Sequence, residues 1–391
     1  MLNGEYGEGV QRAMKMLVTI GDAFDAEKML PINRAHVALS GQEADLYFVE
    51  GMVKGGASCR ISATTNPLFD FEHLKHMPIA EDDLNMSRRT VNAYRRVGAI
   101  LSLSCMPYLW ENIPIYGEHV AFSESSATPY VNSVIGARTS REAAQSALAA
   151  AITGRTPEYS FHLKENRRGT ILVQVKAILK DEFDYSLLGH HVGERIGYGI
   201  PVFTGIPKKP TVEELTSLCA MLNVSGAVPM FHIVGVTPEA PTTKEAFRNL
   251  PPEDKLDVTE YELKQAHEKL CTTSGKIDLA MFGCPHHTFK QIKTIAKLLE
   301  GKKIHHDVSL WICTSIQAKV LAERMGYADS IRKAGGDVVA DTCIDVPCWN
   351  SLKDKTGITD SPKCAYFRRF KDVMVARVPN CVEAAIRGEW K

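Results

Sequence analysis

The chain has 391 residues, of which 45% are hydrophobic and 24% charged, and its formal net charge is zero. At about 100–200 residues per domain this length predicts two or three domains, and the balanced charge argues against a protein built to bind nucleic acid or an anionic membrane surface. No apolar run approaches the roughly 18 residues of a membrane span, and the N-terminus lacks the basic and apolar regions of an export signal, so we expect a cytoplasmic protein whose ten cysteines are reduced thiols or metal ligands.

An amphipathic helix and two short strands are predicted in the first part of the chain. Apolar residues recur at helical spacing over residues 10–18, and Gly21 can end that helix. The run Ala57–Ala63 indicates a strand that a polar, proline-containing turn follows. Ile100–Ser104 indicates a second strand, which ends directly before Cys105.

Between residues 140 and 240 the pattern alternates, with predicted helices over 141–153 and 212–223 and predicted strands over 170–179 and 228–236. Ser140 is expected to cap the first helix, and Thr211 with Glu214 forms a capping box for the second. The charged, proline-bearing segment 241–265 is expected to be a surface excursion or a linker.

The last third carries the clearest alternation of strands and helices. Strands are predicted over 277–282, 308–313 and 337–341, and Thr288 with Gln291 makes a capping box for the helix after the first of them. This pattern predicts an α/β fold with a parallel sheet. Because ligands bind beyond the carboxyl ends of such strands, we expect Cys284, Thr314 and Cys343 to lie at one crevice.

We divide the chain into three expected α/β domains: residues 1–100, a central domain over 101–235 with most of the polar motifs, and a C-terminal domain over 236–391. The stretch from Cys105 to Thr170 is too polar for a core and is rich in small residues. Such a composition is typical of a site where the backbone approaches a ligand closely. Five cationic side chains can clamp a carboxylate or a phosphate; they are Arg138, Arg141, Arg167, Arg168 and Lys363. Arg138 and Lys363 stand out because of their neighbours.

Three cysteines share one context, because Cys105, Cys284 and Cys343 each follow an apolar strand and precede a turn. Three thiolates can hold three irons of an iron–sulfur cluster and leave a fourth iron open as a Lewis acid. Buried cysteines are also common as small hydrophobic residues. Cys348 is the alternative ligand, and the other cysteines are not expected to bind metal; they are Cys59, Cys219, Cys271, Cys313, Cys364 and Cys381.

Histidines are weaker candidates. The adjacent pairs at 190–191 and 286–287 rarely supply two ligands to one metal, and a zinc enzyme needs at least three convergent ligands. The group His305-His306-Asp307 is expected to be exposed, at the amino end of a strand. Candidate acid–base groups are Glu124, Asp345, His119 and His286, although for each taken singly a structural hydrogen bond is the more common role.

Several longer motifs resemble the aconitase X family across nearly the whole chain. They are Cys105-Met-Pro-Tyr-Leu, Gly117-Glu-His, Glu124-Ser-Ser-Ala, Asn132-Ser-Val-Ile-Gly-Ala-Arg-Thr, Glu165-Asn-Arg-Arg-Gly-Thr, Val234-Gly-Val-Thr-Pro-Glu-Ala, Gly283-Cys-Pro-His and Asp341-Thr-Cys. The resemblance is to the large, cluster-binding subunit. One segment departs from the family: where it has a Ser-Ala-Lys-Tyr-like motif, this chain reads Ser361-Pro-Lys-Cys-Ala-Tyr.

The resemblance implies an aconitase-like fold, with several α/β domains and parallel sheets around a central cluster-binding cleft. It implies that Cys105, Cys284 and Cys343 bind an iron–sulfur cluster, expected to be 4Fe-4S with one open iron. Expected substrate-binding residues are Ser40, Asn66, Pro67, Asn132, Arg138 and Lys363. Expected catalytic residues are Glu124, Ser125, Ser126, Asp345 and His286.

The same resemblance implies a hydro-lyase that removes water from a hydroxy-carboxylate. The expected reaction is dehydration of (R)-5-phosphomevalonate to an anhydromevalonate phosphate, with dehydration of cis-3-hydroxy-L-proline as the alternative. A separate small swivel-domain subunit is expected to carry a serine base, so this chain alone should be inactive. Two other classes stay open: a zinc or thiolate enzyme with Cys284 as nucleophile, and a non-catalytic scaffold subunit.

Overall fold

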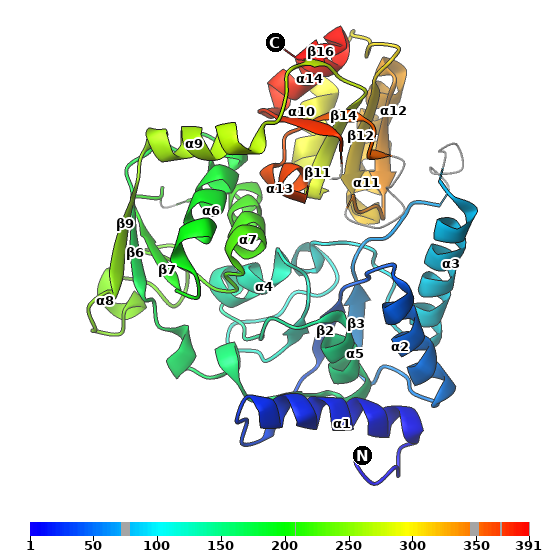
Figure 1. Ribbon diagram of the computed structural model, residues 1–391, viewed down its shortest axis with the longest axis vertical. Helices are drawn as coiled ribbons and strands as arrows, with labels where there is room; N and C mark the ends of the chain where they lie inside the picture. The colour runs from blue at the N-terminus through cyan, green and yellow to red at the C-terminus, as the bar shows by residue number, and fades with distance from the viewer. Residues whose placement is uncertain (72–78, 208, 345–351, 368–369, 391) are drawn as a thin grey trace.

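A computed structural model describes residues 1–71, 79–207, 209–344, 352–367 and 370–390. Three α/β units follow one another along the chain, and each is built on a parallel sheet. In Figure 1 the first unit runs from blue to cyan, the second is green, and the third runs from yellow to red. In the part of the chain that the structure describes, no helix is both long enough and apolar enough to cross a bilayer.

The first unit centres on a three-stranded sheet of order β3-β2-β4. Its elements are α1 (Glu8–Ala23), β1 (Met29–Pro31), β2 (Arg34–Val37), α2 (Glu43–Lys54), β3 (Ser62–Thr65), α3 (Glu81–Arg96), β4 (Ala121–Phe122), α4 (Ala127–Pro129), α5 (Ala144–Thr153) and β5 (Arg155–Pro157). The central helix α5 is fully buried over residues 147–152. Its small alanine side chains keep good helix propensity and let it pack closely against β2 and α1.

The second unit is a four-stranded parallel sheet of order β8-β7-β6-β9. Its elements are β6 (Ile171–Val175), α6 (Glu182–Ile196), β7 (Pro201–Thr204), α7 (Val212–Gly226), β8 (His232–Ile233), α8 (Thr243–Ala246), β9 (Asp254–Val258) and α9 (Glu260–Leu270). Helices α6 and α7 pack backbone to backbone, because a Cβ added to Gly226 would lie 2.2 Å from the carbonyl oxygen of Gly193. That contact requires glycine.

The third unit is a five-stranded parallel sheet of order β13-β12-β11-β14-β15. Its elements are β10 (Gly275–Lys276), β11 (Leu279–His287), α10 (Phe289–Leu298), β12 (Ser309–Thr314), α11 (Ile316–Arg324), α12 (Tyr327–Ala334), β13 (Gly336–Ala340), β14 (Thr356–Thr359), α13 (Pro362–Phe367), β15 (Asp372–Val375), α14 (Val378–Arg387) and β16 (Glu389–Trp390). The chain runs from β11 to β12 and β13 on one side, then returns to β14 and β15 on the other. Strand β11 therefore borders the switch point of this sheet, where open α/β folds place their ligands.

The parallel sheet expected in the last third is confirmed, and both capping boxes are present. Several local expectations were wrong. Helix α1 continues past Gly21, and strand β3 covers only the last residues of the predicted run and extends to Thr65. Ile100–Ser104 forms a single bridge to Thr64 instead of a strand. Only residues 232–233 of the strand predicted over 228–236 are a strand.

Two further corrections concern larger segments. Ser140 does not cap a helix, because its hydroxyl donates to the Tyr159 carbonyl and α5 begins only at Ala144. The segment 241–265 is not a linker, since it supplies β9 to the second sheet and most of α9. Most of β9 is solvent-exposed, so its charged residues hid the strand pattern.

Buried polar contacts join the first two units. The Arg167 side chain is fully buried, donates to the Asn132 carbonyl at 2.8 Å and pairs with Glu239 at 2.5 Å. The Asn223 side chain of α7 donates to the Ser125 carbonyl at 2.7 Å. These bonds fix the second unit against the polar loops of the first.

Candidate active site

One cavity of about 430 Å³ collects side chains from all three units. The first unit contributes residues 38–40, 42, 66–67, 105, 123–125 and 141, and the second contributes residues 223–224 of α7. The third unit adds the end of β11 and the residues after β13 and β14. The sites predicted from sequence that line it are Ser40, Asn66, Pro67, Cys105, Glu124, Ser125, Cys284, His286, Cys343 and Lys363.

The three predicted cysteines meet at this cavity. Cys284 lies near the carboxyl end of β11, Cys343 follows β13, and Cys105 lies in the first unit. The backbone N–H of His286 donates to the Cys105 sulfur at 3.2 Å. Burial raises the pKa of the Cys105 thiol, and the nearby Glu124 carboxylate raises it further. Binding a cation would therefore have to displace the proton of this thiol.

The spacing of the sulfurs distinguishes between kinds of metal centre. With zinc–sulfur bonds of about 2.3 Å, three sulfurs on one ion would lie about 4 Å apart. In the described residues, only His305, His306 and Asp307 bring three ligand atoms within 4.8 Å of one another, so at least one pair of the cavity sulfurs is further apart. Cys105, Cys284 and Cys343 therefore do not form a compact site for one ion, and cysteine sulfurs around one cavity are the ligands that iron–sulfur clusters use.

Gly283 holds the end of β11 in place beside β12. Its φ of +93° belongs to the left-handed region, and an added Cβ would lie 2.0 Å from the Cys313 carbonyl oxygen. We expect Gly283→Ala to lower the free energy of unfolding by about 2–4 kcal/mol, measured in guanidinium chloride. Gly301→Ala is the control, since its φ of +70° gives the same kind of strain with open space around it. Equal losses of unfolding free energy in the two variants would contradict the close approach of Gly283 to the Cys313 carbonyl oxygen.

A buried ion pair lies beside the cysteines. Lys363 Nζ is 3.3 Å from Glu124 Oε1 and donates to Ser125 Oγ at 2.8 Å. Burial by itself raises the pKa of Glu124, but the Lys363 ammonium and hydrogen bonds from Asn66 and the serines outweigh it and lower the pKa to about 2. Burial lowers the pKa of Lys363, but the Glu124 carboxylate, together with the cysteine sulfurs when they are ionised, outweighs burial and raises that pKa above the ordinary value. Both side chains are charged at neutral pH.

The segment that departs from the family motif still presents its lysine to the cavity. Ser361 Oγ donates to the Cys284 carbonyl and accepts the backbone N–H of Cys364. Pro362 opens α13, a position that proline suits because its missing N–H would have no partner there. Ser361 thus ties the turn at Cys284 to the helix that carries Lys363.

A histidine that the sequence did not point to supports the carboxylate from behind. His36 Nε2 lies 2.7 Å from Asn66 Oδ1, and Asn66 Nδ2 donates to Glu124 Oε2 at 2.8 Å. The Asn66 carbonyl can only accept, so His36 Nε2 carries the proton and Nδ1 accepts from Thr64. Burial lowers the pKa of His36 to about 4, so the ring is neutral and orients Asn66.

His286 lines the cavity in a fixed tautomer. Its Nε2 lies 2.9 Å from the Thr342 carbonyl oxygen, which can only accept, so the proton is on Nε2 and Nδ1 is a bare acceptor. Burial lowers its pKa to about 4. Nδ1 has no hydrogen-bond partner among the described residues. His286 is therefore neutral, with its tautomer fixed and its acceptor nitrogen buried beside the cavity.

The structure does not bring every predicted residue to this cavity. Ser126 is buried next to it and donates to the Cys105 carbonyl at 3.1 Å. Asn132 has no exposed surface and bonds to Thr139, Pro229 and Arg167, while Arg138 donates to the His162 carbonyl at 3.0 Å. Neither lines the cavity. Asp345 and the alternative ligand Cys348 lie outside the described residues.

Of the other cysteines and the candidate histidines, some lie at the cavity and others lie away from it. Cys313 also lines the cavity, at the end of β12. Cys59, Cys219, Cys271, Cys364 and Cys381 do not line it. His119 lies 2.9 Å from His162, away from the cavity, and the exposed His306 and Asp307 agree with the sequence expectation for that group. Arg141, which the sequence ranked below Arg138, is the arginine that reaches the cavity.

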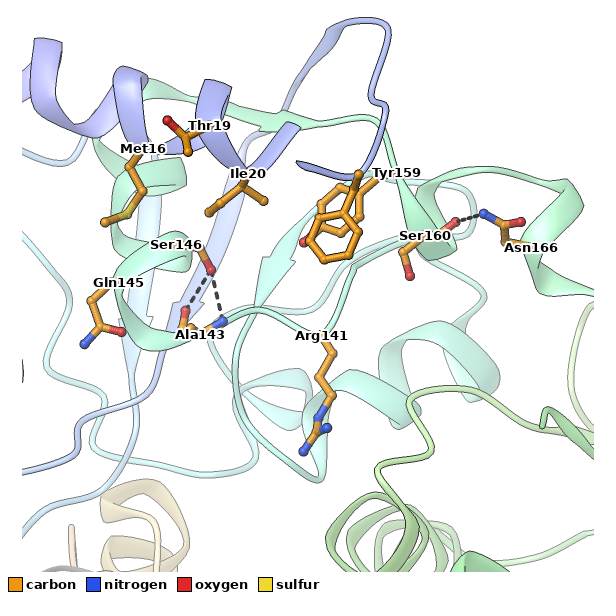
Figure 2. A pocket seen from close by; sticks show the side chains of 11 residues that line it. Met16, Thr19, Ile20, Arg141, Ala143, Gln145, Ser146, Tyr159, Ser160 and Asn166 are labelled. Atoms are coloured by element: carbon orange, nitrogen blue, oxygen red, sulfur yellow. Dashed lines mark hydrogen bonds between the residues drawn. The ribbon is translucent and has the colours of Figure 1, made fainter. Parts of the chain in front are cut away.

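A larger cavity of about 940 Å³ lies between α1, the start of α5 and the loop around Tyr159 (Figure 2). Its lining contains hydroxyl, amide and apolar side chains and the guanidinium of Arg141, but no thiol, carboxylate or imidazole. Phe24 stacks on Tyr159 at its edge, with ring centroids 4.7 Å apart. The chemistry of an elimination needs acid–base or metal-binding groups, so the smaller cavity is the candidate active site.

Comparison of the chain with known proteins identifies one family. Models of the first, second and third aconitase X domains match residues 1–165, 169–268 and 277–387. Over 378 residues the chain is 38% identical to the phosphomevalonate dehydratase large subunit of Methanocaldococcus jannaschii, covering 94% of this chain and 93% of that protein. The chain belongs to the aconitase X family. The predicted family and aconitase-like α/β fold are thereby confirmed.

Two further relatives give information about the fold and about the substrates of similar proteins. The crystal structure of Thermococcus kodakaraensis aconitase X in its holo form superposes with a TM-score of 0.88 at 34% identity, covering 98% of this chain and 97% of that one. The cis-3-hydroxy-L-proline dehydratase of Pseudomonas aeruginosa is 31% identical over 404 residues, covering 99% of this chain and 69% of that protein. The Methanocaldococcus and Pseudomonas relatives are named dehydratases, which agrees with the predicted hydro-lyase class.

Proposed function

We propose that this chain is the large subunit of an iron–sulfur dehydratase that removes water from (R)-5-phosphomevalonate to give an anhydromevalonate phosphate. The observation that carries the proposal is the convergence of three thiols with the buried Glu124–Lys363 pair on one cavity. The similarity to phosphomevalonate dehydratase large subunits supports this substrate over cis-3-hydroxy-L-proline, since 38% identity over nearly the full length of both proteins exceeds 31% over 69% of the other relative.

Cys105, Cys284 and Cys343 would hold the cluster, which we propose to be 4Fe-4S with one open iron. When bound, such a cluster supplies a Lewis acid that coordinates a hydroxyl group and eases its departure. The His286 N–H on the Cys105 sulfur belongs to the contacts that tune such centres.

The protein's own charged groups take distinct parts in the elimination. Glu124 has a pKa of about 2 and is a carboxylate at neutral pH, so it cannot protonate a leaving hydroxyl and instead fixes Lys363 and Asn66. The described residues accept two of the three Lys363 N–H donors, at Ser125 and Glu124. The third can stabilise the charge on a departing oxygen or a substrate carboxylate. Lys363 is therefore the proposed electrostatic partner of that oxygen.

A partner subunit completes the proposed enzyme. Relatives named as large subunits imply a small one. We assign to it the serine that removes the proton from the carbon next to the hydroxyl-bearing carbon. This chain alone then binds the cluster and substrate but does not turn over.

The proposal is tested with the large chain and its cognate small subunit, purified and reconstituted without oxygen. We expect (R)-5-phosphomevalonate, but not cis-3-hydroxy-L-proline, to give an unsaturated product that absorbs in the ultraviolet and has lost one water by mass. Omitting the small subunit should abolish the reaction. Turnover of hydroxyproline alone would establish the alternative substrate, and a full cluster without turnover of either compound would favour a scaffold role.

A further inference from the structure

Arg141 is placed on the active-site cavity by an irregular stretch of backbone. Residues 140–143 are not helical, because α5 begins at Ala144. Figure 2 shows the Arg141 side chain extending away from Ile20 and Tyr159. It lines both the larger cavity and the cavity that holds Ser125, Lys363 and the cysteines, so it stands at the boundary between them.

The charges around the active-site cavity leave this guanidinium uncommitted. The charged side chains of its described lining are Glu124, Lys363 and Arg141. Glu124 and Lys363 neutralise each other at 3.3 Å. Arg141 is solvent-exposed and forms no ion pair or side-chain hydrogen bond with any residue that the structure describes. Among the described lining residues, Arg141 therefore carries the charge that no counter-ion balances, and it can bind an anionic group of a ligand.

The chemistry of phosphate recognition suits Arg141 better than Lys363. A guanidinium offers a planar fork of N–H donors that binds phosphate oxygens in pairs. Lys363 is buried and already bonded to Ser125 and Glu124, near the cysteines. Ser40 and Gln42, at the start of α2, line the same cavity and add hydroxyl and amide donors.

We propose that Arg141 binds the phosphate group of the substrate and makes the enzyme selective for phosphorylated hydroxy acids. This inference rests on the proposed function and specifies its substrate site. The carboxylate and hydroxyl of the substrate then lie towards the cysteines and Lys363, and the phosphate lies at the rim. Arg138 has no such part, because its guanidinium is held by the His162 carbonyl away from the cavity.

The test compares Arg141→Gln, Arg141→Lys and the control Arg155→Gln in the reconstituted two-subunit enzyme. Arg155 is exposed on β5 and lines neither cavity. Loss of a charge-assisted pair should raise the KM of Arg141→Gln for (R)-5-phosphomevalonate on the order of 10- to 100-fold, with kcat within about threefold of wild type. The KM of Arg141→Lys should lie between those of wild type and Arg141→Gln, and the KM of Arg155→Gln should equal that of wild type. An unchanged KM, or a fall in kcat alone, would overturn the assignment.

Calorimetric binding separates this inference from the proposed reaction. The probes are (R)-5-phosphomevalonate and (R)-mevalonate, which lacks the phosphate. Wild type should bind the phosphorylated compound more tightly, and Arg141→Gln should remove that preference. If wild type shows the preference without any turnover, the phosphate site stands while the reaction is wrong. If Arg141→Gln keeps the preference while wild type turns over phosphomevalonate, the reaction stands and the phosphate lies elsewhere.

Discussion

Replacing Cys284 by serine is expected to abolish cluster binding and, with it, all dehydration. Cys284 supplies one of the three thiols proposed as cluster ligands, and a serine hydroxyl at neutral pH is a far weaker ligand for iron than a thiolate. Anaerobically purified Cys284→Ser should contain little iron or acid-labile sulfide and lack the brown absorbance of the cluster. The fold should survive, because the exchange conserves shape and Cys284 is only partly buried.

The matched control is Cys59→Ser, which alters a partly buried cysteine that does not line the cavity. Cys219→Ser, in α7, gives a second control inside the core. Both should keep the iron and sulfide content of wild type. A Cys284→Ser protein with an unchanged spectrum would remove Cys284 from the ligand set, and bleaching of either control would mean that the wrong thiols were chosen.

The cysteine set was accessible from sequence because each member follows a strand within a recognisable motif. Chain order alone suggested that Cys284 and Cys343 share the carboxyl edge of one parallel sheet, and the structure places both on the cavity. Cys105 comes from a different sheet, so its approach depends on how the units pack. That packing rests on long-range contacts such as Asn223 to Ser125, which leave no local pattern in the sequence.

The structure brings Arg141 to the cavity, whereas Arg138, which stood out in the sequence, does not line it. A helix beginning at residue 141 would give Arg141 an ordinary exposed helical position. The helix begins three residues later, and the extended backbone before it redirects Arg141 to the cavity. Ser140 looks like a cap but bonds to Tyr159, a partner 19 residues away. Such competition between local capping and tertiary hydrogen bonds is not resolved by propensity.

His36 was missed for a related reason. Its strand β2 is only four residues long, Arg34–Val37, and it is buried on the side that carries the histidine. Short strands of this kind have too few residues for a clear period. The role of His36 is visible only through its partners, since it reaches Glu124 through Asn66.

The domain boundaries at residues 100 and 235 stay a prediction.

Lys363→Met is expected to lower both stability and activity strongly. It leaves the buried Glu124 carboxylate without its cation, and breaking such a pair costs about 3–5 kcal/mol. Loss of the ammonium from the cavity should lower kcat on the order of 100- to 1,000-fold. The control Lys176→Met breaks a pair with Asp257 that is about half exposed, so it should cost less than about 1 kcal/mol and leave kcat unchanged.

The pH dependence of the Lys363→Met effect identifies its cause. In the wild type the Glu124 pKa is lowered to about 2 from 4.5, so its stabilising contribution is complete above pH 4.5 and is lost only as the pH falls towards 2. Without the ammonium, burial acts on Glu124 with less opposition and its pKa rises, so the carboxyl takes up its proton at a higher pH. The difference in unfolding free energy between variant and wild type should therefore be large at pH 8 and smaller at pH 4.5, measured by guanidinium unfolding of the cluster-free chain.

In the background of Glu124→Gln, adding Lys363→Met should lower the free energy of unfolding by the same amount at both pH values, because no carboxylate remains to titrate. A gap that stays constant with Glu124 present would show that the loss comes from packing and not from the ion pair.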